Sequence, residues 1–476
     1  MTGAALAASL RERGLPPGEV DAKAALFDLV LSPTRHQQGG PLHAWWVPGR
    51  LEVFGKHTDY AGGRTLVCAV PRGFAVVAQA RDDSTLHVVD ARRGQEVTLP
   101  AARPPTPDAY SGWRHYVDVV ARRLAGNFPG APLGADIVIA SDLPRASGMS
   151  SSSALLVAIA TALTRVGALD RRPEWRANIA GAGDVAGYYA CIENGLSFGT
   201  LAGDAGVGTH GGSEDHAAIL TGVAGHITAF AFVPMRSLAM VGVPEQWCFV
   251  LTPSGVPAQK AGGAREAYNR LAGGTQVLLD LWNGGLFTRA PSLAAALFGP
   301  SGSGPVTAAS LVGGDRLRAL ITSSRVPGWP SDLLERRLEH FIREDGRIPA
   351  ALGAFREASA ARLGTLAEES QADAETLLGN QIPETSALSR SARSLGAFAA
   401  CSFGAGFGGS VWALVEHDLA DAFARRWHPD AFIAPPGPPV VELTRDGGEG
   451  GNGGRERREG TEGTGQDQHA GTKARG

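Results

Sequence analysis

A run of four serines, Ser150–Ser153, constrains the fold of this chain more than any other feature. It follows the strand-like segment GADIVIA (134–140) and leads directly into an apolar helical pattern that extends to Leu163. Small residues let the backbone approach a ligand, and the first turn of a helix presents N–H groups without partners. One serine could simply cap the helix, but four serines after a glycine favour a phosphate-binding loop. The predicted phosphate contacts are Ser147, Gly148, Ser150, Ser151, Ser152 and Ser153.

Two other glycine-rich segments do not fit the common nucleotide motifs. The segment from Gly49 to His57 has the wrong spacing for a Walker-type P-loop and ends in Gly-Lys-His, so a P-loop is excluded. The segment GAGFGG (404–409) satisfies GxGxxG, but the strand pattern SVWALVE follows it where a dinucleotide fold needs a helix. It is predicted to be a turn of low bulk that packs against a nucleotide or the serine loop. Its predicted ATP contacts are Gly406 and Gly408.

Helical and strand patterns follow one another in mixed order, which predicts an α+β fold. The length of 476 residues predicts two or three domains, with one boundary near Pro234 to Pro244. Residues 285–347 carry Gly/Pro punctuation and one charged helical segment, LLERRLEHFIRED, so they are interpreted as an elaborated surface region. Other strands are expected at 225–233, 247–252 and 410–416, and helices at 4–30, 264–282 and 348–378.

The composition narrows the range of partners. Forty-four basic residues against 47 acidic ones give a net charge of −3, which provides no bulk field for a nucleic acid or an acidic membrane. No apolar run approaches the roughly 20 residues that cross a bilayer. The four cysteines are far apart and are expected to be reduced. These features predict a cytoplasmic monomer that acts on small molecules.

Three motifs in sequence make the chain similar to the GHMP kinases, and within them to the galactokinases. They are GRLEVFGKHTDYAGG (49–63), LPRASGMSSSSAL (143–155) and GAGFGGSVWALV (404–415). The resemblance implies a GHMP kinase fold that binds ATP and Mg²⁺ in a cleft between its two domains. The implied domains are one like the second domain of ribosomal protein S5 (41–238) and a ferredoxin-like one (239–445). The residue pattern itself predicts an N-terminal helical extension (1–40) and, from a lack of aromatic and large aliphatic residues, a disordered tail (446–476).

The same resemblance assigns roles to individual residues. Arg50 matches the arginine beside the reacting hydroxyl, and Asp215, in GGSEDH, matches the proposed general base. Ser152 and Glu193 match the magnesium ligands. The implied sugar contacts are Lys56, His57, Asp59 and Tyr60.

Elementary chemistry supports the pairing of Arg50 with Asp215. A sugar hydroxyl is a poor nucleophile, so a carboxylate within hydrogen-bond reach and a fixed cation help to remove its proton. Simpler interpretations stay open, because Arg50 and Asp215 could form only a structural ion pair. Glu193 could be a solvated helix carboxylate, and His57 a core histidine.

The chain departs from the galactokinases at several positions. Lys56 stands where they have a glutamate that faces C6 of the sugar, and Glu52 replaces an asparagine. A lysine there would suit a carboxylate, so one hypothesis is a hexuronic acid substrate; alternatively, Lys56 points away or pairs with Glu52. His216 replaces a glutamine, and a glycine-rich insertion spans 199–212. A further departure lies near Ala264, where galactokinases often have a sugar-contacting tyrosine.

The leading hypothesis is therefore an ATP-dependent kinase that forms a sugar 1-phosphate. Galactose is the expected substrate, followed by a uronic acid or arabinose. A non-catalytic regulator that binds sugar and ATP is a different class, and the presence of both Arg50 and Asp215 argues against it. A GHMP kinase for mevalonate, homoserine or an inositol is disfavoured by the His-x-Asp-Tyr run at 57–60.

Overall fold

The first motif begins in the larger β-sheet, which has eight strands within the described part of the chain. The structure is a computed structural model that describes residues 1–32, 40–101, 110–144, 147–257, 263–285, 288–299 and 308–444. Arg145, Ala146 and the predicted tail at 446–476 lie outside the described residues. Residues Met1–Thr444 form one unit by their internal contacts.

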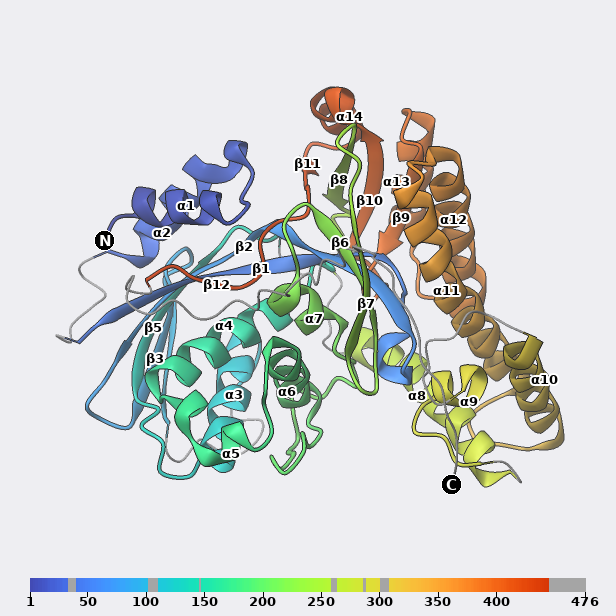
Figure 1. Cartoon of the computed structure of the whole chain (residues 1–476), viewed down its shortest axis with the longest axis horizontal. Coiled ribbons are helices and arrows are strands. Elements are labelled where there is room, and N and C mark those ends of the chain that lie inside the picture. Colours follow the sequence, from blue (N-terminus) through green and yellow to red (C-terminus); the bar gives the residue numbers. More distant parts are fainter. Residues whose placement is uncertain are drawn as a thin grey trace, which may run out of the picture. The chain divides into compact units, whose positions relative to one another are not determined.

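Six strands of this sheet follow the order β12-β1-β2-β5-β3-β4, and β6 and β7 extend it from β2 (Figure 1). β3 and β5 run parallel, whereas β1 and β2 form a long antiparallel pair. The predicted strands at 134–140 and 225–233 are confirmed as β5 and β6. The bounds are β1 Leu42–Phe54, β2 Arg64–Ala80, β3 Thr85–Asp90, β4 Gln95–Pro100, β5 Ala135–Ser141, β6 His226–Ala231, β7 Arg236–Gly242 and β12 Val441–Glu442.

Neighbouring side chains of β1 enter two different cores, because successive residues of a strand point to opposite faces. Trp46 packs with Leu6 and Phe27 of the N-terminal helices. Trp45 packs in the larger core, which includes Leu156 of the helix that follows the serine loop. The N-terminal helices are α1 (Gly3–Glu12) and α2 (Val20–Val30), and the opposite face carries α3 (Trp113–Asn127), α4 (Ser151–Val166), α6 (Ala182–Asn194) and α7 (Glu214–Thr221), with the short α5 (Pro173–Arg176) beside them (Figure 1).

The smaller sheet has the order β11-β8-β10-β9. Val250 and Val411 pack on one face with Trp427, whereas Phe249 and Trp412 join the larger core on the other face. The predicted strands at 247–252 and 410–416 are confirmed. The elements are β8 (Trp247–Pro253), β9 (Ala399–Phe403), β10 (Ser410–Glu416), β11 (Phe432–Ile433), α11 (Ser331–Arg356), α12 (Ala360–Asp373), α13 (Pro383–Ser394) and α14 (Ala420–Trp427).

Two predicted helices are each divided. The pattern at 4–30 forms α1 and α2. α1 ends at Glu12, just before Gly14 with a φ of 102°, a conformation typical of the residue after a helix, and Pro16 and Pro17 lie between the two helices. The single helix predicted at 348–378 is wrong, since α11 ends at Arg356 and α12 begins after Ala358. The φ of Ala358 is 48°, outside the right-handed helical region.

The interpretation of residues 285–347 as a surface region is wrong for the charged segment. That segment lies in α11, whose Arg337, His340, Glu344 and Asp345 are buried. Asp345 receives hydrogen bonds from the backbone and the guanidinium of Arg64, at the start of β2. α11 therefore supports the first motif. The helices α8 (Gly263–Gly284), confirmed where 264–282 was predicted, α9 (Leu293–Phe298) and α10 (Ala308–Ser323) share a small core with it.

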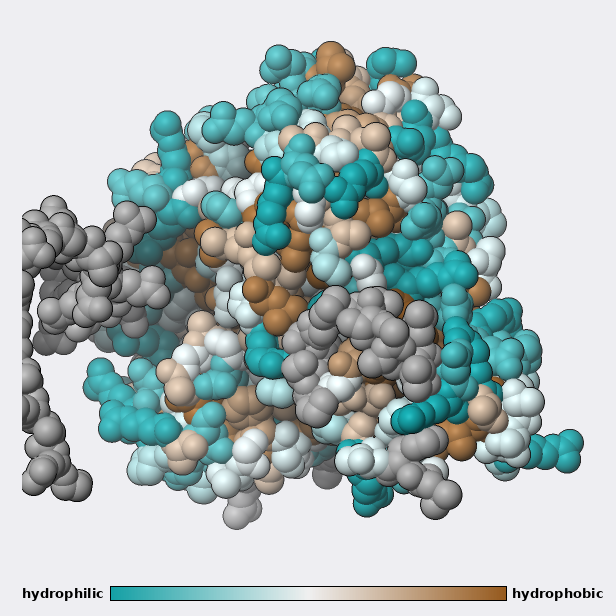
Figure 2. Space-filling view, turned by 45° about the vertical axis from the view of Figure 1, so that its right-hand side comes forward, coloured by the Kyte–Doolittle hydropathy of each residue, from teal (hydrophilic) through white to brown (hydrophobic). Residues whose placement is uncertain are grey.

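The predicted domain boundary at 238/239 falls inside β7, which keeps its place in the larger sheet to Gly242. The chain also returns to that sheet at its other end, where Val441 pairs with Trp46. Hydrophilic side chains are interspersed with hydrophobic ones on the face shown in Figure 2. Within the described ranges, no helix combines the length and apolar content that crossing a membrane requires.

Candidate active site

A cavity of about 870 Å³ brings together residues from all three motifs. Its walls come from β1, the first turns of α3, α4 and α7, the end of α6, α8 and the turn before β10. Predicted site residues in this lining are Arg50, His57, Asp59, Tyr60, Gly148, Ser150, Ser151, Ser152, Ser153, Glu193 and Asp215.

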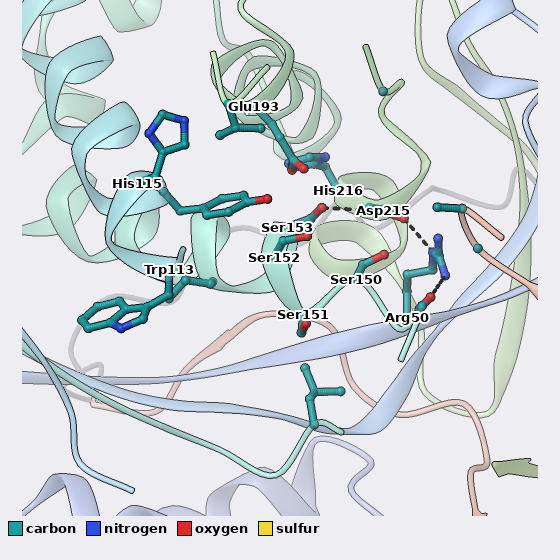
Figure 3. A pocket seen from close by; sticks show the side chains of 18 of the residues that line it. Arg50, Trp113, His115, Ser150, Ser151, Ser152, Ser153, Glu193, Asp215 and His216 are labelled. Carbon is teal, nitrogen blue, oxygen red and sulfur yellow. Dashed lines mark hydrogen bonds and ion pairs between the residues drawn. The ribbon is translucent and has the colours of Figure 1, made fainter. Parts of the chain in front are cut away.

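The serine loop presents the start of α4 to this cavity (Figure 3). Ser150 precedes the helix with a φ of 53°, and its side chain does not cap the first turn. The first N–H groups of α4 are thus directed at the cavity together with the hydroxyls of Ser151–Ser153. Ser147 faces the other way, since its hydroxyl donates to the carbonyl of Pro144 and its own carbonyl accepts from Ser410.

The glycine-rich turn packs closely on the serine loop, as predicted. A Cβ on Gly404 would lie 2.8 Å from the carbonyl oxygen of Gly148, and one on Gly148 would lie 3.3 Å from that of Phe403. Gly404 and Ala405 line the cavity. Gly406 instead abuts Asn380, so the predicted ATP contacts of Gly406 and Gly408 stay predictions.

Arg50 and Asp215 meet beside the first turn of α4 (Figure 3). Nε of Arg50 donates to Oδ1 of Asp215 at 2.7 Å, and Nη1 donates to the carbonyl of Gly148 at 2.7 Å. The hydroxyl of Ser153 donates to Oδ2 of Asp215 at 3.0 Å. The second motif, the first motif and α7 are therefore joined through a single carboxylate.

Further carboxyl groups surround Arg50. Its Nη2 lies 3.2 Å from Oε1 of Glu214 and 3.8 Å from Oε2 of Glu52. Burial raises the pKa of Glu52, Asp59 and Glu214, most strongly for Glu214, where Glu52 and Asp59 add repulsion. Asp59 accepts the backbone N–H of Glu214 at 3.2 Å, which fixes the start of α7.

An aromatic group closes the same end of the cavity. Nδ1 of His57 lies 2.9 Å from the hydroxyl of Tyr60, and the ring of Tyr268 lies 5.2 Å from that of His57. Arg337 of α11 donates to the hydroxyl of Tyr60 at 3.0 Å and to the carbonyl of His57. His57 has a φ of 58°, which is uncommon outside glycine, and Arg337 holds that turn in place.

Lys56 points away from this cavity. Its ammonium is 1% exposed, donates to the hydroxyl of Ser370 at 2.6 Å and lies 3.8 Å from Glu344 of α11. Among the described residues that line the cavity, Lys56 is missing. The placement removes the physical basis for reading Lys56 as a ligand of a sugar carboxylate.

The acidic metal ligand expected from the sequence lies beside a histidine. Oε2 of Glu193 is 3.3 Å from Nε2 of His216, and Figure 3 shows both groups beside Ser152 and Ser153. Within the described ranges there is no cluster of three or more His, Cys, Asp or Glu side chains suited to a metal. A nucleotide-bound ion held mainly by phosphate oxygens and water needs only one or two protein ligands, so these residues fit Mg²⁺.

Family models match three parts of the chain. The galactokinase galactose-binding signature matches residues 35–80, the GHMP kinases N terminal domain 115–194 and the GHMP kinases C terminal domain 351–434. The galactokinase of Actinobacillus pleuropneumoniae serotype 3 (strain JL03) is 28% identical over 384 residues, 80% of this chain and 87% of that protein. The galactokinase of Haemophilus influenzae (strain ATCC 51907 / DSM 11121 / KW20 / Rd) is 26% identical over 385 residues, 79% of this chain and 86% of that protein.

The chain is a galactokinase-like GHMP kinase. The crystal structure of Lactococcus lactis galactokinase complexed with galactose has a similar fold, with a TM-score of 0.68 and 21% identity. The match covers 89% of the galactokinase-like chain and 99% of the other. The predicted GHMP kinase fold is confirmed.

Several residues of this site were not predicted: Tyr268, Glu214 and Trp113 line the cavity, and Arg337 contacts the lining residue Tyr60. The region near Ala264 was interpreted as a departure from the galactokinases, which often have a sugar-contacting tyrosine there. Tyr268 lies only four residues further along α8 and lines the cavity, so the sequence did offer a candidate tyrosine. Glu214 directly precedes Asp215, so its proximity could have been inferred. Arg337 and Trp113 come from segments that the three motifs do not reach, and no sequence signal identified them.

Proposed function

We propose that this protein transfers the γ-phosphoryl group of ATP to the anomeric hydroxyl of a monosaccharide, with galactose as the first candidate. The observation that supports this most strongly is the contact between Arg50 and Asp215 at the first turn of α4. It places a carboxylate and a fixed cation next to a phosphate-binding helix start, which is the pairing that phosphoryl transfer to a hydroxyl needs.

In the proposed reaction, the anomeric oxygen bonds to the γ-phosphorus while the bond from that phosphorus to the β,γ-bridging oxygen breaks. Asp215 takes the hydroxyl proton, and Arg50 stabilises the negative charge that develops nearby. Because Arg50 and Ser153 hold the two oxygens of Asp215, the carboxylate is oriented before substrate arrives.

The start of α4 is the proposed triphosphate site. The N–H groups of Ser150–Ser153 and the hydroxyls of Ser150 and Ser151 would donate hydrogen bonds to phosphate oxygens, while the hydroxyl of Ser153 stays on Asp215. Ser152 and Glu193 would hold Mg²⁺, which offsets negative charge on the phosphates when bound.

The charges around Arg50 favour a neutral sugar. Glu52, Glu214 and Asp215 all contact this guanidinium, whereas the ammonium of Lys56 lies against Ser370 and Glu344. A uronate would add negative charge to a region already rich in carboxyl groups. We therefore place galactose and arabinose ahead of galacturonate and glucuronate.

The test is a coupled ADP-release screen with magnesium-ATP against galactose, arabinose, galacturonate, glucuronate and N-acetylgalactosamine. We expect the highest kcat/KM for galactose or arabinose. A uronate used at least as well would reverse the specificity proposal. Binding of sugar and ATP without ADP release would instead identify a regulator.

A further inference from the structure

His216 is a buried polar side chain that the proposed reaction does not use. It lines the cavity but is only 1% exposed, and it follows Asp215 directly in α7. Neither of its ring nitrogens has a hydrogen-bond partner among the described residues. Burying an imidazole without a partner costs free energy, so such a group calls for a ligand.

The position of Glu193 indicates what that ligand is. Its Oε2 lies 3.3 Å from Nε2 of His216, without the geometry of a hydrogen bond. Two ligand atoms each about 2.1 Å from one divalent ion lie roughly 3.0 Å apart at a right angle and roughly 3.4 Å apart at a tetrahedral angle. The observed separation lies between these values.

The surrounding contacts hold the ring in this position without a metal. Asp59 accepts the N–H of Glu214, and Arg50 and Ser153 both bind Asp215, so the first turn of α7 is fixed. Figure 3 shows the ring of His216 and the carboxylate of Glu193 next to each other, above Ser152 and Ser153.

We propose that His216 is an imidazole ligand of the nucleotide-bound divalent ion, and that it shifts the preference of this site from Mg²⁺ towards Mn²⁺ and related ions. Mg²⁺ keeps oxygen ligands, whereas divalent first-row transition ions, of which Mn²⁺ binds most weakly, gain more from an imidazole ligand. The inference rests on the proposed function only for the presence of a metal–nucleotide site. Glutamine, which the galactokinases have at this position, offers no imidazole.

The experiment uses the full-length protein with Mn²⁺ and ADP. Electron spin echo envelope modulation of bound Mn²⁺ detects a coordinated ¹⁴N, and titration of the free Mn²⁺ signal gives the Kd. We expect nitrogen modulation in the wild-type complex and its loss in His216→Gln. The ratio of Mn²⁺ to Mg²⁺ affinity should fall at least about tenfold in the variant, a loss that even outer-shell changes produce at metal sites.

His115→Gln is the matched control, because His115 also lines the cavity and has a buried ring nitrogen without a partner. It should keep the wild-type modulation. Absence of nitrogen modulation in wild type overturns the proposal whether or not His216→Gln folds, and so does an unchanged metal preference in the folded variant. His216 and Glu193 would then form a structural pair. Because the readout is metal coordination, a protein that binds Mn²⁺–ADP through nitrogen but phosphorylates no sugar would contradict only the proposed function.

Discussion

The first motif contributes one cation to each of two buried charge clusters. The clusters differ in how many of their carboxyl oxygens have hydrogen-bond partners. The Arg50 cluster, formed by Arg50, Glu52, Glu214 and Asp215, lines the cavity. The Lys56 cluster, formed by Lys56, Glu344, Arg347 and Ser370, lies in the interior behind it. Both begin from the same short segment of chain, only six positions apart.

Glu344 of the Lys56 cluster has partners on both oxygens. Oε1 accepts the backbone N–H groups of Gly55 and Lys56, and Oε2 accepts from Arg347 at 2.8 Å. Burial alone would disfavour its charge, but Lys56 and Arg347 outweigh burial and lower the pKa of Glu344 to about 2. Both oxygens of this carboxylate are therefore satisfied, although Nε of Arg347 has no hydrogen-bond partner among the described residues.

The Arg50 cluster is left incomplete. Oε1 of Glu52 and Oε2 of Glu214 accept no hydrogen bond from an N–H group or a hydroxyl of the described residues; burial raises the pKa of both groups, and a hydrogen bond between the two side chains opposes the shift of Glu52. Since an unpaired buried acceptor is costly, such atoms are typical of a site that awaits a ligand. Both clusters are buried, so burial does not tell the cavity cluster from the interior one; the pairing of their carboxyl oxygens does.

The largest expected effect is that of Asp215→Asn. The amide keeps an oxygen for Arg50 or Ser153 but cannot take the hydroxyl proton, so kcat should fall about 10²–10⁴-fold while ATP affinity and the thermal midpoint change little. The measurement is steady-state ADP release with calorimetric ATP titration.

Glu214→Gln is the matched control, because Glu214 contacts the same guanidinium at 3.2 Å. Its kcat should fall less than that of Asp215→Asn. Loss of ATP binding in Asp215→Asn, or the larger kcat loss in Glu214→Gln, would show that the base is wrongly assigned.

Lys56→Met should affect stability rather than chemistry. It removes the buried ammonium that faces Glu344, and breaking one partner of such a pair costs about 3 kcal/mol of unfolding free energy. Denaturant unfolding measures the loss, and the ratio of galactose to galacturonate turnover should stay the same. A changed ratio would assign Lys56 to the sugar site after all.

Glu344 gives the stability a defined pH dependence. Its pKa is about 2 in the folded protein against an ordinary value of 4.5. The stabilising contribution is therefore full above about pH 4.5 and is lost as the pH falls towards 2. The difference in unfolding free energy between wild type and Glu344→Gln should narrow on acidification over this range. A difference independent of pH would mean that the carboxylate is not held as described.

The smallest expected effect is that of Glu52→Gln. The amide oxygen can still accept the N–H of Gly404, while one negative charge leaves a crowded group. The unfolding free energy should change by no more than about 1 kcal/mol. A loss of several kcal/mol by the same denaturant assay would show that the Arg50 cluster is as tightly paired as the Lys56 cluster.

The motifs predicted the serine loop and the glycine-rich turn better than the cavity residues that other segments supply. The serine run before an apolar helix predicted the start of α4. The low bulk of the glycine turn predicted close packing against a nucleotide or the serine loop, and the serine loop is the neighbour that the structure shows. Tyr268 was not predicted, because a helical pattern does not show which residue of α8 faces the cavity.

The direction of Lys56 could not be read from the first motif. It depends on Glu344 and Ser370, which lie 288 and 314 positions further along the chain. The charged segment of α11 was predicted to lie at the surface, because charged residues are usually exposed. Their burial follows from partners such as Arg64 that only the tertiary structure supplies.

The most direct test of the central claim is ³¹P NMR of the products formed from galactose and magnesium-ATP. We predict equimolar ADP and a sugar phosphate whose phosphorus couples to the anomeric proton, with neither formed by Asp215→Asn at a comparable rate. Free phosphate without a sugar phosphate, or phosphorus coupled to the C6 protons, would contradict transfer to an anomeric oxygen held beside Asp215.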